Sequence, residues 1–396
     1  MCDTKTFTSI GICGGGKMGL SFFKYLSRFS NYSVVFHIRD TNRIARLKKK
    51  YCEMDLCVSF TDRIEDLCDC DIVFEFVAEE ISIKREIMQK LLESGKNPSQ
   101  ILATGSSSFT PGRLSAEYDR YNLIGVHYLY PVQDMQTVEV VYGDRTPMDL
   151  VDKVCLFLEH IGKIPVRIGE GTGCITTRVL TVIGNEAYRI HGELHIPFSD
   201  LDEIISDSGY TLPPFTLKDN VGLDTIYNCI CGHYEFREEF ESFFPLREYL
   251  NGKLKQGHLG KKSGEGFYRY KNQEDFPKPV ENKVPEEIKA KIKERIKLLY
   301  INSSFELVDR GYADCVELDR IFCEINGNDK GPVRTLFQEG AEVVVERLKK
   351  YSQEIDSLYR PLPVLEYISK YSQGSEEIDR QVRDFKMGGK RPDWYP

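Results

Sequence analysis

The sequence predicts an α/β protein with one doubly wound, mostly parallel sheet in its first part and helices in its second part. Short strand-forming runs alternate with helical segments up to about residue 168. A glycine-rich turn follows the first strand-forming run, and strand signals nearly vanish after Gly173. Strands that alternate with helices are typical of a parallel sheet with helices on both faces.

The first strand, over 8–13, leads into a tight glycine turn. Gly14, Gly16 and Gly19 stand at the G-x-G-x-x-G spacing, with Lys17 and Met18 between the last two. The first glycine permits the turn, the second lets the backbone approach a pyrophosphate, and the third lets the following helix pack closely. A helix over 20–29 and a strand over 33–38 complete a β-α-β unit. We therefore expect a Rossmann-like dinucleotide site over this turn.

The rest of the first part continues the same alternation. The run 71–77 is almost continuously apolar, as expected for a strand covered on both faces. A helix over 81–92 follows it. The remaining elements predicted here are strands at 101–104, 123–127, 137–142 and 164–168 and a helix over 149–161.

The second part predicts helices at 175–192, 200–208, 217–232, 237–251 and 286–310. A polar, proline-rich stretch over 274–287 indicates a linker. We expect three domains: a dinucleotide-binding domain over 1–168, a helical domain over 169–273, and a second helical copy with a C-terminal tail over 285–396.

An internal repeat links the two helical domains. A proline and a glycine recur at equal spacing, preceded in both copies by an asparagine and a Leu-Asp pair. The matched residues are Pro214 and Gly222 with Pro332 and Gly340, Asn185 with Asn302, and Leu201-Asp202 with Leu318-Asp319. Such matched offsets indicate a duplication.

Composition narrows the class of protein. A formal net charge of −8 and a pI near 5.6 argue against a general nucleic-acid binder. Twelve cysteines in a chain of 396 residues indicate reduced thiols and a cytoplasmic location. We find no apolar run of membrane-spanning length and no room for a cleaved signal before the first strand. Cys229, Cys231 and His233 are too closely spaced for a good tetrahedral site, so we expect no metal.

Two clusters of polar residues lie where a doubly wound sheet binds ligands. Ser106, Ser107 and Ser108 follow the strand over 101–104, and a serine there can donate a hydrogen bond to a substrate oxygen. His127 ends one strand and Glu139 lies in the next. An imidazole held by a carboxylate is a general base with a fixed tautomer, and we expect this pair to be catalytic.

The end of the strand over 33–38 leaves the cofactor open between NAD and NADP. A carboxylate at this point would bind the ribose 2′-hydroxyl of NAD, and Asp40 is the candidate. Arg39 instead suits the 2′-phosphate of NADP, and basic residues follow on the next helix. The position of the strand end decides between the two readings.

Taken in chain order, these motifs resemble the 3-hydroxyacyl-CoA dehydrogenase family in its extended form with two tandem helical domains. The stretches that carry the resemblance are Gly14–Gly19, Glu75–Lys84, Ser107-Ser108, His127 with Glu139, Gly173–Arg178, Pro213–Asp224 and Leu259–Tyr268. The family interconverts a 3-hydroxyacyl-CoA and a 3-ketoacyl-CoA by hydride transfer with a nicotinamide cofactor.

The resemblance implies roles for single residues. His127 takes the proton of the substrate 3-hydroxyl, Glu139 holds the imidazole, and Ser107 hydrogen-bonds the reacting oxygen. Glu79 and Lys84 match positions that contact cofactor and substrate. The helical domains of the family pair between subunits, so we expect the two copies here to pack as a pseudo-dimer within one chain. Further homodimerisation stays open.

The chain departs from the family pattern at three positions. Gly105, Tyr130 and Thr177 stand where the family usually has asparagine, and the third asparagine belongs to the catalytic site. Thr177 offers one short hydroxyl in place of an amide. Two alternatives follow: a dehydrogenase for a free 3-hydroxy acid or another small hydroxylated substrate, and a cofactor-binding scaffold or sensor with little or no turnover.

Overall fold

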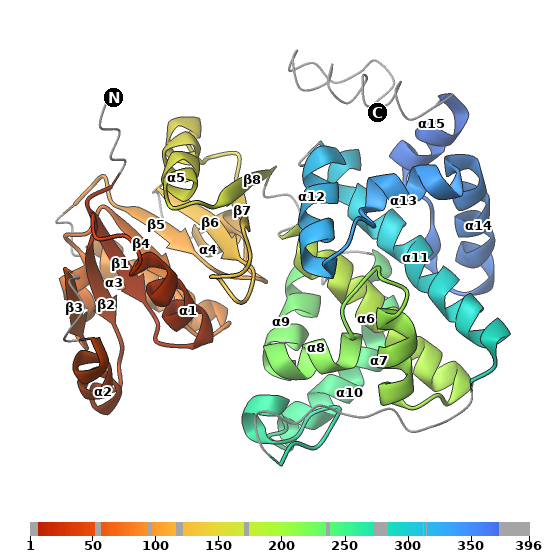
Figure 1. Ribbon diagram of the computed structural model, residues 1–396, viewed down its shortest axis with the longest axis horizontal. Helices are drawn as coiled ribbons and strands as arrows, with labels where there is room; N and C mark the ends of the chain where they lie inside the picture. The colour runs from red at the N-terminus through yellow and green to blue at the C-terminus, as the bar shows by residue number, and fades with distance from the viewer. Residues whose placement is uncertain are drawn as a thin grey trace. The chain divides into compact units, whose positions relative to one another are not determined.

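The chain forms two compact units, Met1–Cys174 and Ile175–Pro396. The computed structural model describes residues 7–51, 57–93, 97–115, 122–169, 174–234, 238–271, 284–311, 313 and 315–371 (Figure 1). The first unit is built on one sheet, and the second is helical. This is the α/β-then-α architecture that the sequence predicts.

The sheet of the first unit has eight strands in the order β3-β2-β1-β4-β5-β6-β7-β8. All neighbouring strands are parallel except β6 and β7, which are antiparallel. The strands are β1 Ser9–Cys13, β2 Ser33–His37, β3 Val58–Thr61, β4 Ile72–Glu75, β5 Ile101–Thr104, β6 Leu123–Tyr128, β7 Thr137–Tyr142 and β8 Ile164–Gly169. The strand order reverses between β1 and β4, which is where doubly wound sheets bind ligands.

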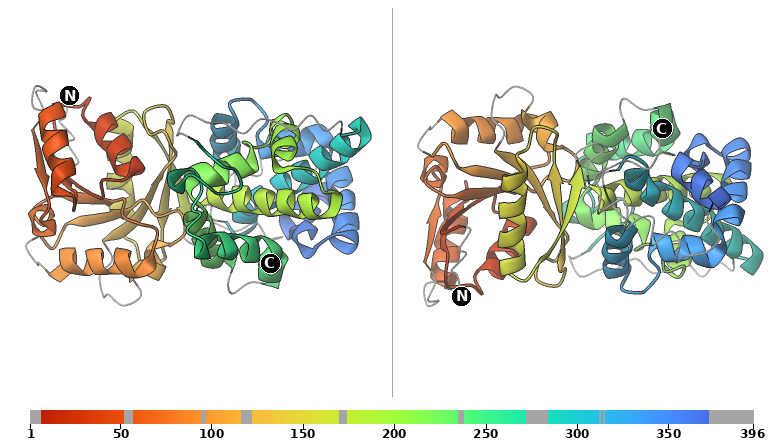
Figure 2. Two further views of the ribbon diagram at one scale, coloured as in Figure 1. Left: turned by 90° about the horizontal axis from the view of Figure 1, so that it is seen from below. Right: turned by 90° about the horizontal axis from the view of Figure 1, so that it is seen from above.

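Helices cover both faces of this sheet (Figure 2). They are α1 Lys17–Leu26, α2 Thr41–Tyr51, α3 Ile81–Glu93, α4 Pro111–Ser115 and α5 Met148–His160, with a short 3-10 helix η1 at Ile64–Leu67. One core contains apolar side chains of α1, α2 and α5, and a second contains those of η1, α3 and α4. Phe74 and Val73 of β4 point into the first and the second core, so neighbouring residues of this strand are both buried.

The second unit contains the residues of both predicted helical copies. Its elements are α6 Ile175–Leu194, α7 Phe198–Ser206, α8 Pro214–Val221, α9 Leu223–Tyr234, η3 Glu238–Phe243, α10 Phe244–Lys255, η4 Lys261–Ser263, α11 Glu286–Asp309, α12 Cys315–Asn326, α13 Pro332–Glu339, α14 Ala341–Glu354, η5 Ser357–Tyr359 and α15 Pro363–Tyr371. None of the described helices is both long and apolar enough to cross a membrane.

Residues matched in the repeat make the same contacts in both segments. Asp202 of α7 accepts the backbone N–H of Phe215 at 2.8 Å and so caps α8, and Asp319 of α12 accepts that of Val333 at 2.8 Å and caps α13. Both capped helices end at a glycine of positive φ, Gly222 or Gly340. Each copy therefore builds the same turn with the same residue types.

Helices α6 and α11, the first helix of each copy, run antiparallel and share buried ion pairs. Arg178 of α6 pairs with Glu306 of α11, and Arg295 of α11 pairs with Glu186 of α6. Arg178 and Arg295 hold matching places in the repeat, so each copy contributes an arginine to the other. Tyr359 of the second copy also donates to Glu186 at 2.7 Å.

All seven predicted strands lie within two residues of the observed bounds, whereas several helix predictions were wrong. The helix expected over 20–29 begins at Lys17 and ends at Leu26, because it starts directly after the glycine turn. The helix expected over 217–232 is two helices, since Gly222 has a φ of 113° and breaks the run. The helix expected over 237–251 is a short 3-10 segment followed by α10. Residues 274–283 of the predicted linker lie outside the described residues.

Candidate functional site

The glycine turn lies between β1 and α1, at the carboxyl end of β1. Gly14 has a φ of 113°, and a Cβ on it would lie 2.4 Å from the carbonyl oxygen of Phe76. A Cβ on Gly19 would lie 1.9 Å from the carbonyl oxygen of Gly14. The fold itself therefore requires these two glycines.

Gly16 differs, because a Cβ there would meet only the Phe76 carbonyl oxygen, at 4.0 Å. Gly16 precedes α1 without a capping side chain, and the first turn of α1 carries no acidic residue. Lys17 and Met18 begin the helix, and Lys17 is exposed. Open space above the N–H groups and positive end of a helix suits a phosphate group. The turn therefore fits the pyrophosphate of a dinucleotide.

His127 and Glu139 are brought together by the antiparallel pairing of β6 with β7, which places them directly opposite one another. Nδ1 of His127 lies 2.6 Å from Oε2 of Glu139. Glu139 is fully buried, and the His127 side chain is 11% exposed. Because the carboxylate accepts a hydrogen bond from Nδ1–H, Nε2 is left as the basic nitrogen of the neutral ring.

Ser107 extends this pair to a chain of three. Its Oγ lies 2.9 Å from Nε2 of His127, so the hydroxyl can donate to the basic nitrogen. Ser107 follows β5, and His127 lies near the end of β6. Both therefore lie at the carboxyl ends of the parallel strands, where the glycine turn also lies. The chain Ser107–His127–Glu139 can accept a proton from a bound hydroxyl and keep the resulting cation paired.

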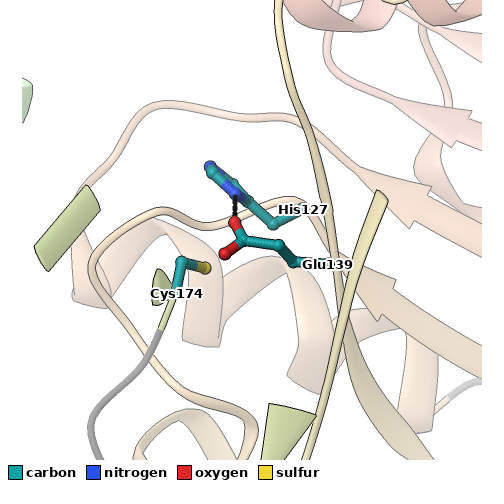
Figure 3. Close-up of side chains that lie close together, drawn as sticks. All are labelled: His127, Glu139 and Cys174. Carbon is teal, nitrogen blue, oxygen red and sulfur yellow. Dashed lines mark hydrogen bonds and ion pairs between the residues drawn. The ribbon is translucent and has the colours of Figure 1, made fainter. Parts of the chain in front are cut away.

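Cys174 also lies beside this pair, and the sequence had given it no role. Figure 3 shows its sulfur next to the Glu139 carboxylate, and ligand atoms of His127, Glu139 and Cys174 lie within 4.8 Å of one another. Nitrogen and oxygen ligands about 2.0 Å from a tetrahedral metal ion would be about 3.3 Å apart. The 2.6 Å contact between His127 and Glu139 is shorter and fits a direct hydrogen bond. The side chain of His233, part of the other candidate metal group, lies outside the described residues.

Glu79 and Lys84 are brought together in a buried ionic cluster. Nζ of Lys84 lies 2.9 Å from Glu75 and 3.1 Å from Glu79, and the side chain is 1% exposed. Burial acts to lower the pKa of Lys84, but the charges of Glu75 and Glu79 outweigh it and raise that pKa.

Glu79 is further held by the serine loop. It accepts Oγ of Ser106 at 2.6 Å and the backbone N–H of Ser108 at 2.7 Å. Burial acts to raise the pKa of Glu79, yet the Lys84 charge and these hydrogen bonds lower it overall. Of the three serines, Ser107 therefore faces His127, whereas Ser106 and Ser108 bind Glu79. The sequence did not predict that Glu75 pairs with Lys84, because Glu75 ends a strand whose other residues are apolar.

The two ribose candidates have different surroundings. The strand β2 ends at His37, one residue earlier than expected. Asp40 accepts the backbone N–H groups of Asn42 at 2.9 Å and Arg43 at 3.1 Å, which is the arrangement of a helix N-cap. Arg39 is exposed.

The three positions that depart from the family pattern belong to different segments. Gly105 follows β5 and packs under the ring of Phe76. Tyr130 is 57% exposed and precedes Pro131 in a cis peptide. Thr177 lies in the first turn of α6, in the second unit, where its carbonyl oxygen accepts Oγ1 of Thr181 at 2.6 Å.

A doubly wound sheet with a phosphate-binding turn and a histidine–carboxylate pair at the same edge defines a nicotinamide-dependent dehydrogenase. Comparison with known families agrees. The NAD binding domain of 3-hydroxyacyl-CoA dehydrogenase matches residues 42–171, and the C-terminal domain of the same enzyme matches residues 173–270. The chain belongs to the 3-hydroxyacyl-CoA dehydrogenase family, as its motifs indicated.

Individual relatives match about half of the chain or more. The mitochondrial hydroxyacyl-coenzyme A dehydrogenase of Mus musculus is 32% identical over 213 residues, 53% of this chain and 67% of that protein. The 3-hydroxybutyryl-CoA dehydrogenase of Clostridioides difficile is 32% identical over 216 residues, 54% of this chain and 75% of that protein. The crystal structure of the Escherichia coli 3-hydroxybutyryl-CoA dehydrogenase covers 92% of this chain and 98% of its own, with a TM-score of 0.70. At 19% identity this last likeness shows the fold alone.

Proposed function

We propose that this chain interconverts a 3-hydroxyacyl-CoA and a 3-ketoacyl-CoA with NAD(P). The observation that carries the proposal is the hydrogen-bonded series Ser107–His127–Glu139. It provides a base with its supporting carboxylate at the carboxyl ends of the strands, where the glycine turn also lies. Family membership supplies the substrate class, and the open space at Gly16 supplies the place for the cofactor phosphates.

The chain's own residues handle the proton and the reacting oxygen. In the oxidative direction Nε2 of His127 accepts the proton of the 3-hydroxyl, and Glu139 stabilises the imidazolium through Nδ1. Ser107 turns its hydroxyl from His127 to the reacting oxygen and holds it beside the base. A nicotinamide cofactor held over the glycine turn would supply the acceptor for the hydride of carbon 3. In the reductive direction the same imidazolium returns the proton.

The other predicted site residues are assigned to the cofactor and to the substrate oxygen. We assign the pyrophosphate to Gly14, Gly16, Lys17, Met18 and Gly19. Glu79, whose side chain is 12% exposed, contacts the cofactor, and Lys84 acts by holding Glu79. Thr177 is assigned to the substrate oxygen on the family resemblance alone.

The direct test is reduction of acetoacetyl-CoA, followed by loss of absorbance at the nicotinamide band with NADH and with NADPH. We expect turnover, and we expect His127→Gln to lower kcat about 100-fold to 10,000-fold. His160→Gln, an exposed residue at the end of α5, is the matched control and should keep full activity. Cofactor binding without turnover for several acyl-CoA lengths would contradict the dehydrogenase and favour the scaffold. Turnover of a free 3-hydroxy acid in preference to its thioester would contradict the substrate class.

We further propose that the two helical copies act as an intramolecular pseudo-dimer. The exchange of arginines between α6 and α11 supports it, because a two-fold interface uses the same residues from both sides. A fragment over 1–273 should aggregate or self-associate, since it exposes the face of α6 that α11 covers. Sedimentation of that fragment as a stable monomer would contradict the pseudo-dimer. Sedimentation of the full chain decides whether it also forms a homodimer.

The cellular location stays a proposal as well. Free, buried thiols such as Cys13, Cys68 and Cys155 are those expected in a reducing compartment, which supports the cytoplasm. Localisation of the tagged full-length protein in cells tests it, and an oxidising compartment would contradict it.

A further inference from the structure

The adenosine-ribose side of the dinucleotide site lies where β2 ends, next to the glycine turn. In a fold of this type, a carboxylate just after this strand binds the ribose hydroxyls of NAD. Here β2 ends at His37, and the next residue is Ile38. The side chain of Ile38 lies against the turn, with its Cγ2 3.0 Å from the position that a Cβ on Gly15 would take. An aliphatic side chain therefore stands where the NAD-binding carboxylate belongs.

Asp40 is the first acidic residue along the chain after β2, and it already serves another purpose. Its Oδ1 accepts the first backbone N–H groups of α2, those of Asn42 and Arg43, at 2.9 Å and 3.1 Å. To reach a ribose hydroxyl through this oxygen, Asp40 would have to give up a helix cap, which costs about 0.5–2 kcal/mol.

Arg39 lies between Ile38 and Asp40 in the sequence and carries a positive charge. It is exposed, and its guanidinium makes no close ion pair or hydrogen bond with the residues that the structure describes. Helix α2, which follows at once, carries Arg43, Arg46 and three lysines and no acidic residue. The positive charge at this end of β2 is therefore available to a ligand.

We propose that this ribose subsite accepts a 2′-phosphate, so that the chain prefers NADP(H) to NAD(H), with Arg39 as the specificity-determining residue. The guanidinium can hold a phosphate with paired hydrogen bonds, whereas Ile38 offers the ribose hydroxyls of NAD no acceptor. The inference rests on the part of the proposed function that places a dinucleotide over the glycine turn. It does not depend on the substrate.

Equilibrium binding to the full chain tests the preference without any turnover. NADPH and NADH are titrated separately, by the change in nicotinamide fluorescence. We expect NADPH to bind about tenfold more tightly or better, as a charge-assisted contact predicts. Adenosine 2′,5′-bisphosphate should bind more tightly than 5′-AMP, which places the effect at the ribose. Equal affinity for the two cofactors, or tighter binding of NADH, would overturn the proposal.

Two variants locate the effect. Arg39→Gln should weaken NADPH about tenfold and leave NADH unchanged, whereas Arg28→Gln, an exposed arginine past the end of α1, should change neither. Ile38→Asp should tighten NADH and weaken NADPH. Equal weakening of both cofactors by Arg39→Gln would overturn the assignment of that residue.

The two proposals can fail separately. NADPH preference in a chain that does not reduce acetoacetyl-CoA leaves the ribose inference standing and removes the proposed activity. Turnover with NADH bound more tightly than NADPH does the reverse. Binding of neither cofactor would overturn both.

Discussion

The ring of Phe76 takes the space that a side chain on Gly105 would need. A Cβ on Gly105 would lie 2.6 Å from both Cδ1 and Cε1 of that ring. Phe76 follows β4, and its carbonyl oxygen also packs against Gly14 of the phosphate-binding turn. The family resemblance places an asparagine at position 105. Its loss in this chain therefore has a local steric cause and is no sign, by itself, of a retired enzyme.

The first prediction tests this pair of residues. Gly105→Ala should destabilise the protein by about 1–3 kcal/mol, because the buried ring has to shift. In a Phe76→Ala background the same change should cost at least about 0.5 kcal/mol less, since the two sites are in contact. Urea unfolding of the four chains gives both values. Gly192→Ala, where a Cβ meets nothing within 4 Å, is the control and should be neutral or stabilising. Additive costs would contradict the steric explanation.

The second prediction concerns Glu139. Glu139→Gln keeps the shape of the buried side chain but removes the charge that stabilises the imidazolium of His127. We expect kcat to fall by about tenfold or more while the affinity for the cofactor stays unchanged. Steady-state kinetics with a separate cofactor titration measures the two effects. Glu159→Gln, exposed on α5, is the matched control. Unchanged kcat would remove Glu139 from the catalytic group.

The sequence predicted best those features that local pattern determines. The strands over 101–104 and 137–142 have the predicted bounds, and the pairing of His127 with Glu139 follows from two adjacent strands. The sequence predicted poorly the contacts between residues that only the folded chain brings together. Cys174 reaches the Glu139 carboxylate only through the fold, and the buried partners of Lys84 come from a strand end and a loop. Strand β3 was missed because four residues with alternating polar positions give a weak signal.

The third prediction follows from the buried cluster around Lys84. Lys84→Met leaves the carboxylates of Glu75 and Glu79 buried without their cation. Removal of one partner of a buried ion pair costs about 3–5 kcal/mol, so we expect a loss of stability of this size at neutral pH. Lys90→Met, which breaks an exposed pair with Glu86 on the same helix, should have little effect. Chemical unfolding of the two variants compares these costs.

The fourth prediction is the pH dependence of the same variant. In the natural chain the pKa of Glu79 is lowered in the folded state, so its contribution to stability is present above the ordinary carboxyl pKa and is lost as the pH falls through the folded value. Without Lys84, burial raises that pKa instead. Lys84→Met should therefore gain stability, relative to the natural chain, as the pH falls from neutral toward the ordinary carboxyl pKa. Parallel unfolding curves over that range would contradict this explanation of the cluster.

The last prediction concerns the ion pair between Arg178 and Glu306, through which the two helical copies contact each other. Arg178 is 1% exposed, and Glu306 also pairs with Arg310, which is half-exposed and 3.3 Å away. We expect Arg178→Met to cost about 3 kcal/mol, the lower end of the range for buried pairs, because Arg310 remains.

The double variant Arg178→Met with Glu306→Met should recover most of that loss, since two apolar side chains replace the pair without leaving a buried charge. Lys291→Met, which breaks an exposed pair with Glu287 on the same helix α11, should have little effect. Urea unfolding measures all three variants. If the double variant is no more stable than Arg178→Met, the cost lies in lost packing between α6 and α11 and not in the stranded carboxylate.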